Sequence, residues 1–132
     1  MIAHKLAARA AAIILAGLMV FQFLLVAGYP LGSAAWGGYF TELPVGLRIA
    51  SLVSTAIYGA LILVALARAG IVETPFGARF GRSALWAITA LFFLGSLMNL
   101  ASQSFWERAI MTPLAFILTA CFYILARHPR NP

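Results

Sequence analysis

The chain is short of charged residues. Of its 132 residues, 9 are Lys or Arg and 3 are Asp or Glu, so only 9% are charged. A soluble domain carries about 25% charged residues. Because so few charges cannot cover a water-facing surface, and because 64% of the residues are hydrophobic, the composition excludes an ordinary soluble domain and indicates a protein surrounded by lipid.

Residues that carry metal or redox chemistry are also scarce. The single cysteine, Cys121, has no partner for an intramolecular disulfide or a C-x-x-C motif. The two histidines, His4 and His128, lie in opposite terminal segments, and no acid or cysteine is spaced to complete a metal site. Nucleophile-elbow, phosphate-loop and dinucleotide motifs are missing from the sequence. We therefore predict no catalytic residue, no cofactor and no metal.

Long uncharged runs account for most of the sequence. The first has roughly 22 residues, or about 33 Å of helix, which is enough to cross a bilayer. It is longer than the apolar part of a cleaved signal peptide, about 7–15 residues, so we expect it to be retained. The predicted fold is all-α, a polytopic membrane protein with four antiparallel transmembrane helices in one domain over 1–132, at about 6–27, 43–66, 83–102 and 105–126.

Two local patterns refine the last helix. Ser104-Phe105-Trp106-Glu107 has the form of a capping box, with the serine at the N-cap and the glutamate three residues later. Pro113 lies inside the helix, lacks an N–H and clashes with the carbonyl four residues earlier. We therefore expect a kink or a loosened turn near Ala109.

A stripe of small residues marks the second helix. Ser51, Thr55 and Gly59 recur every four positions on one face. Small side chains let helix backbones approach closely in lipid, so this face is predicted to contact another helix.

The basic residues predict the orientation. The net charge is +6, but the basic residues stand at the ends of apolar runs, which favours membrane headgroups over nucleic acid as their partner. Two of them, Arg48 and Arg108, fall on the side of the first and third loops. By the positive-inside rule both termini are cytoplasmic, because the other seven lie on the opposite side: Lys5, Arg9, Arg68, Arg79, Arg82, Arg127 and Arg130.

Polar side chains gather at the end opposite the termini. The candidate cluster there contains Arg48, Asn99, Gln103 and Glu107. An unpaired buried charge would cost several kcal/mol or more. We expect Arg48 to pair with Glu107, with Asn99 hydrogen-bonding the guanidinium; the alternatives are that Arg48 reaches the headgroups or holds an anionic ligand.

The first loop, 28–43, is rich in glycine and aromatic residues. Its candidate surface is Trp36, Gly37, Gly38 and Tyr39. The simpler interpretation of Trp36 and Tyr39 is that they anchor the protein at headgroup depth.

Several short motifs resemble those of a group of small four-helix bacterial membrane proteins with no assigned function. They are Gly28-Tyr29-Pro30-Leu31-Gly32, Ala35-Trp36-Gly37-Gly38, Leu43-Pro44 with Leu47-Arg48-Ile49, Ser51 and Ser54, and then Asn99, Ser102, Ser104, Glu107-Arg108 and Thr112-Pro113. Relatives carry polar residues after the glycine pair, where Tyr39 and Phe40 stand here. The resemblance implies the same architecture and a bacterial inner membrane, and it supplies no activity.

Three classes of function remain. The favoured one is a non-enzymatic membrane protein that acts as an accessory subunit for a membrane-protein partner or binds lipid or a lipid-like ligand. The second is a small transporter or channel, which needs a homo-oligomer and would use the small-residue stripe as its interface. The least favoured is an enzyme acting on a lipid, which would need an acid or base of shifted pKa in the polar cluster.

Overall fold

The structure, a computed structural model, describes residues 2–73 and 81–128, and every regular element in them is helical. The predicted all-helical fold with four long apolar helices is confirmed, since each helix is long and apolar enough to cross a membrane. The long helices are α1 (Ile2–Val26), α2 (Val45–Arg68), α3 (Arg82–Leu100) and α4 (Thr112–Arg127), with short helices η1 (Gly32–Ala34), η2 (Trp36–Gly38) and η3 (Glu107–Met111).

Helix α1 begins four residues before its predicted start. The segment contains Lys5 and Arg9 among alanines, and both basic side chains are exposed. Alanine, lysine and arginine are all good helix formers. The helix therefore continues through the basic segment that the hydrophobic pattern alone leaves out.

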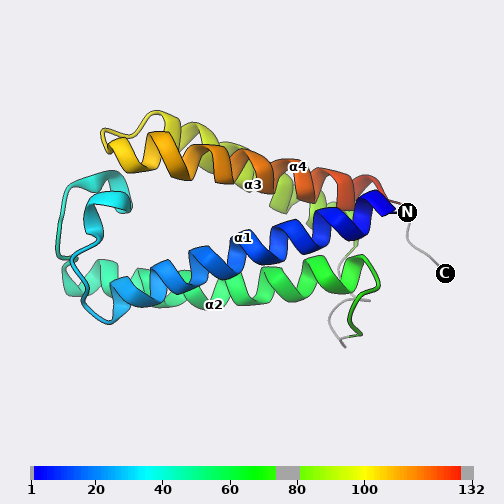
Figure 1. Ribbon diagram of the computed structural model, residues 1–132, viewed down its shortest axis with the longest axis horizontal. Helices are drawn as coiled ribbons and strands as arrows, with labels where there is room; N and C mark the ends of the chain where they lie inside the picture. The colour runs from blue at the N-terminus through cyan, green and yellow to red at the C-terminus, as the bar shows by residue number, and fades with distance from the viewer. Residues whose placement is uncertain (1, 74–80, 129–132) are drawn as a thin grey trace.

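The helices form two antiparallel hairpins. Helix α1 packs along α2, and α3 packs along α4 (Figure 1). The hairpins meet mainly through α1 and α4, whereas α2 and α3 make few contacts with each other. Any space between the hairpins therefore lies on the side where α2 faces α3.

The main core occupies the half of the molecule that contains the termini. Alanines of α1 lie in it with little or no exposed surface, which allows α1 to approach its neighbours closely. Larger side chains of α4 fill the remaining space. The buried members are Ala7, Ala8, Ala11, Leu15, Val64, Ala65, Ala69, Leu85, Leu118, Cys121, Phe122, Leu125 and Ala126.

Both ends of the described chain lie together at this terminal end. The rings of His4 and His128 stack with centroids 3.7 Å apart. The Arg68 side chain, at the end of α2, donates hydrogen bonds to the carbonyls of Leu125 and His128. The loops 27–44 and 101–104 lie at the other end, which we call the loop end (Figure 1).

Large apolar side chains cover much of the outer surface. Ile13, Leu91 and Met98 are 72%, 67% and 74% exposed. Soluble monomeric proteins rarely expose contiguous apolar surface of this extent to water. This surface matches the sequence-based expectation of a lipid environment.

The expected loosened turn before Pro113 is confirmed. The residues Glu107–Met111 form a π-helical turn, in which the Thr112 N–H and hydroxyl both donate to the Glu107 carbonyl. Proline cannot donate to the carbonyl of Ala109, and the wider turn relieves the clash that its ring would cause in an α-helix.

The small-residue stripe of α2 faces the interior of the protein, as predicted. Ser51 is fully buried, and a Cβ placed on Gly59 would lie 3.2 Å from the Met19 Cε atom of α1. The stripe therefore serves the packing of α1 on α2 within one chain.

We expect Gly59→Leu to lower the stability of the protein by about 1–3 kcal/mol, because overpacking forces α1 and α2 apart. Gly46→Leu is the matched control, since a Cβ at Gly46 in the same helix would meet nothing within 4 Å. Thermal melts in detergent, followed by circular dichroism, measure the difference. Equal melting temperatures for the two variants would contradict the assigned contact.

Candidate functional site

The first loop joins α1 to α2, and its hydrogen bonds link the first hairpin to the second at the loop end. The Trp36 indole N–H donates to the Ser51 hydroxyl of α2 across 3.0 Å. The Gly37 backbone N–H donates to the Glu107 carboxylate across 3.0 Å, and the Ser104 hydroxyl donates to the Ser33 carbonyl. Three side chains from two hairpins therefore hold one loop in place.

Trp36 has an unusual backbone conformation. Its φ of 51° lies in the left-handed region, and it is the only non-glycine residue with positive φ among the described residues. Such a conformation costs about 1–3 kcal/mol and persists only where the surroundings enforce it. Here the hydrogen bonds on either side, from the indole and from Gly37, fix it.

The predicted capping box forms only in part. The Ser104 hydroxyl accepts a hydrogen bond from the Glu107 N–H at 3.3 Å, as expected for an N-cap. The glutamate side chain does not return to the Ser104 N–H, which donates to the Ser102 hydroxyl. The Glu107 carboxylate is used for the contact with the first loop.

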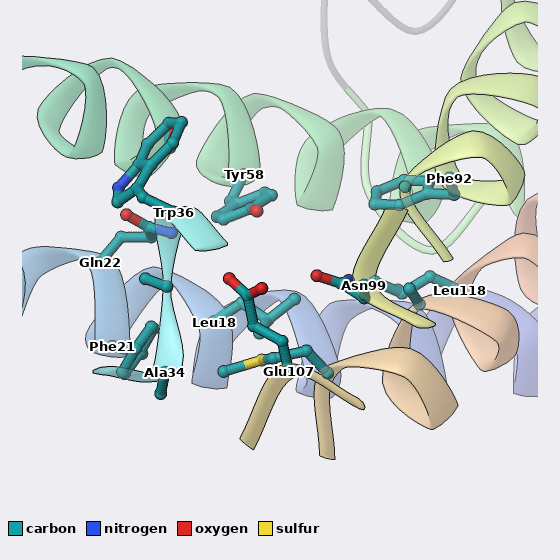
Figure 2. A pocket seen from close by; sticks show the side chains of 15 residues that line it. Leu18, Phe21, Gln22, Ala34, Trp36, Tyr58, Phe92, Asn99, Glu107 and Leu118 are labelled. Atoms are coloured by element: carbon teal, nitrogen blue, oxygen red, sulfur yellow. The ribbon is translucent and has the colours of Figure 1, made fainter. Parts of the chain in front are cut away.

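A cavity of about 220 Å³ lies between the hairpins beneath this loop. All four helices contribute to its wall, and its apolar part is formed by aliphatic and aromatic side chains (Figure 2). We call it the inter-hairpin cavity. It is lined by Leu18, Phe21, Gln22, Ala34, Ala35, Trp36, Ser54, Tyr58, Phe92, Gly95, Asn99, Glu107, Met111, Ala115 and Leu118.

Hydrogen-bond acceptors are concentrated in the wall of the inter-hairpin cavity. The Gln22 Oε1 atom is buried and has no hydrogen-bond partner in the described part of the chain. Glu107 is only 6% exposed, and its side chain points into the space between Tyr58 and Asn99 (Figure 2). One Glu107 oxygen accepts from Gly37, and no described residue donates to the other. In this wall only the Gln22 oxygen is both buried and without a donor among the described residues. The unbonded Glu107 oxygen opens into the space, where a donor on an occupant could bind it.

A second hollow, the loop-side cleft, adjoins the inter-hairpin cavity and shares part of its wall. Its volume is about 480 Å³. It brings together three members of the predicted polar cluster, Asn99, Gln103 and Glu107. Three residues of the predicted loop surface, Trp36, Gly37 and Tyr39, line it as well. The fourth loop residue, Gly38, packs against Ser104.

Arg48 lies apart from the other members of the predicted cluster, and its expected pairing with Glu107 is wrong. The guanidinium donates two hydrogen bonds to the Val26 carbonyl, from Nε at 3.2 Å and from Nη2 at 2.7 Å. Carbonyls in the last turn of a helix have no partner within the helix. Arg48 therefore caps α1, and the bond satisfies both the arginine and the helix end.

The sequence analysis did not single out Gln22 and Tyr58, which line the inter-hairpin cavity. Gln22 is the only amide side chain in the first apolar run, and an isolated amide in a membrane helix is a usable signal. Tyr58 offers no comparable signal, because an aromatic residue within an apolar helix is usually a packing residue.

The chemistry available to the site is recognition by charge, hydrogen bonds and aromatic faces. Among residues 2–73 and 81–128, no three His, Cys, Asp or Glu side chains gather where they could hold a metal ion. Glu107 is the single ionisable carboxyl group of the inter-hairpin cavity, with Tyr58 and amides around it. Small-molecule sites are typically apolar concave surfaces with a few convergent polar groups, and the inter-hairpin cavity has both features.

Comparisons with protein families, curated proteins and solved structures found no match for this chain.

We expect Gly38→Ala to destabilise the protein more than Gly70→Ala does. Both glycines have positive φ, +78° and +75°, so alanine costs about 1–2 kcal/mol in backbone strain at either position. Only at Gly38 would the new Cβ also approach Ser104, at 2.8 Å from its Cβ. The melting temperature should fall further in Gly38→Ala than in Gly70→Ala, and the difference measures the close contact between the first loop and the second hairpin. Equal losses in the two variants would show that this contact is absent.

Proposed function

We propose that this protein is an integral protein of the bacterial inner membrane that binds a lipid-like small molecule between its two helical hairpins. Four helices of membrane-spanning length and an apolar outer surface support the membrane location. In the sequence, seven of the 9 basic residues lie in the terminal segments and the second loop, which supports cytoplasmic termini by the positive-inside rule; two of them, Arg79 and Arg130, lie outside the described residues.

The inter-hairpin cavity carries the proposal of binding. Its buried Gln22 oxygen lacks a donor, and Glu107 points into the same space. A filled, dry interior would indicate a purely structural bundle. A cavity into which a carboxylate oxygen opens without a donor from any described residue instead favours an occupant that supplies one.

The position of the cavity favours a ligand that arrives from the lipid. Helices α2 and α3 are not closely packed, and Tyr58 from α2 and Phe92 from α3 line the space between them. An apolar chain could enter between these helices while its polar group reaches Glu107 and Asn99. Such a ligand has the chemistry of an amphiphile.

The arrangement of α2 does not support the alternative, an oligomeric transporter built on the small-residue stripe. Ser51 is buried and bonded to Trp36, and Gly59 faces Met19 of the same chain. These residues are therefore not free to form an interface with a second copy.

Reporter fusions test the orientation. We expect a fusion at the C-terminus to report the cytoplasm and one inserted in the loop after Gly32 to report the periplasm. The reverse result, or the same side for both, would overturn the proposed topology.

Gly95→Leu tests the binding function. A Cβ at Gly95 would meet nothing within 4 Å, and the residue lines both hollows, so a leucine should fill the space without disturbing the helices. We expect native mass spectrometry of the protein released from membranes to detect a bound amphiphile on the wild type and to lose it in Gly95→Leu.

Gly17→Leu is the matched control, because Gly17 is an exposed helical glycine with nothing within 4 Å and lies outside both hollows. It should retain the bound molecule. All three proteins should unfold cooperatively, and Gly95→Leu should melt below the other two only by the stabilisation that the ligand gives. A wild type without any bound amphiphile, or a Gly95→Leu variant that retains it, would overturn the proposed function.

A further inference from the structure

The inter-hairpin cavity contains one acidic group and no basic one. Its lining includes Glu107 and lacks Lys, Arg and His, and the same is true of the lining of the loop-side cleft. In a low-dielectric site an unpaired carboxylate is costly, and an opposite charge placed beside it is bound strongly.

Two basic residues are the candidate partners of Glu107: Arg108 is next to it in the sequence, and Arg48 lies at a similar depth along its own helix. Both donate hydrogen bonds to other groups. Arg48 donates to the Val26 carbonyl. Arg108 directs its Nη1 atom to the Ser102 carbonyl, at 2.7 Å, on the exposed side of the turn. Neither guanidinium forms an ion pair with Glu107 in the described part of the chain. No basic side chain of the described residues therefore balances the charge of Glu107, and a bound cation could do so.

The hydrogen-bonding groups of the cavity wall also favour a positively charged ligand. The Gln22 oxygen is an orphan acceptor, and an ionised Glu107 can only accept. An ammonium group with N–H bonds could donate to the Glu107 carboxylate. A ligand whose only charge is negative, on a phosphate or carboxylate, would bring further acceptors into a wall that has no basic side chain to receive them.

Aromatic side chains line part of the space that the Glu107 carboxylate enters. Trp36 and Tyr58 lie on one side of the space that Glu107 enters, and Phe92 lies farther along it (Figure 2). The faces of tryptophan and tyrosine attract organic cations, with about 0.5–2 kcal/mol for each suitable contact. A carboxylate beside aromatic faces is therefore suited to a cation that also carries apolar groups.

We propose that the polar group of the ligand is an organic ammonium ion, bound at Glu107 beneath the Trp36 loop with its apolar part in the inter-hairpin cavity. This inference rests on the proposed binding function and adds the charge of the ligand to it. The same chemistry could come from an ethanolamine lipid or from a free amphiphilic amine.

Titration calorimetry in uncharged maltoside micelles tests the inference with three probes of matched chain length. They are octylammonium, octyl sulfonate and octan-1-ol. We expect the wild type to bind the ammonium probe at least about tenfold more tightly than the sulfonate, since one charge-assisted contact distinguishes them. Octan-1-ol should bind to the wild type and fail to bind to Gly95→Leu.

Glu107→Gln is the key variant, because its remaining oxygen can still accept from Gly37. It should weaken binding of the ammonium probe about tenfold or more and change octan-1-ol binding much less, because octan-1-ol carries no charge. Tyr58→Leu keeps the charge and removes an aromatic face, so it should weaken the ammonium probe by roughly twofold to fivefold. A melt of each variant verifies that it is folded.

The outcomes separate the two proposals. Octan-1-ol could bind in the cavity while the ammonium probe binds no more tightly than the sulfonate and no more weakly to Glu107→Gln. In that case the inferred charge of the ligand is wrong and the binding function stands. If no probe binds to the wild type, the binding function fails as well. Where the ammonium inference holds, the mass of the molecule bound to protein taken from membranes identifies its source as an ethanolamine lipid or a free amine.

Discussion

The hydrogen bond from the Gly37 N–H to the Glu107 carboxylate is the contact on which the loop end depends. It joins the first hairpin to the second at a place where α2 and α3 are not closely packed. In lipid, no hydrophobic force draws two apolar helices together, so polar contacts and close packing decide where they meet. Here the alanine-rich face of α1 closes the terminal half, and the loop contacts close the other end above an open space.

The same carboxylate explains several local departures from regular structure. A full capping box would direct Glu107 back to Ser104, and the side chain would then leave the cavity. The structure keeps half of the box, and a π-helical turn follows at once. Such turns often occur at functional sites. The strained backbone of Trp36 belongs to the same arrangement, because it presents both the indole and the Gly37 N–H to their partners.

Much of the fold could be predicted from the sequence, because helix length and apolar runs set it. Pro113 predicted the altered turn, and the spacing of Ser51, Thr55 and Gly59 predicted an inward face. The depth of Asn99, Gln103 and Glu107 could be judged from their positions along the helices, and the structure places them in one cleft. The sequence shows how far along its helix a residue lies but not how the helix is rotated about its axis. This is why Gln22 and Tyr58 were missed.

The wrong pairing of Arg48 has the same origin. Charge complementarity pointed to Glu107 at the same depth, but an arginine can also be satisfied by the free carbonyls of a neighbouring helix end. Because Val26 lies next to Arg48 across the α1–α2 hairpin, the arginine is satisfied within its own hairpin. Glu107 is then left without a basic partner among the described residues. An apolar, aromatic cavity that retains one uncompensated carboxylate is better suited to selecting a ligand by charge than to stabilising the bundle, because a buried charge without its partner is destabilising until that partner arrives.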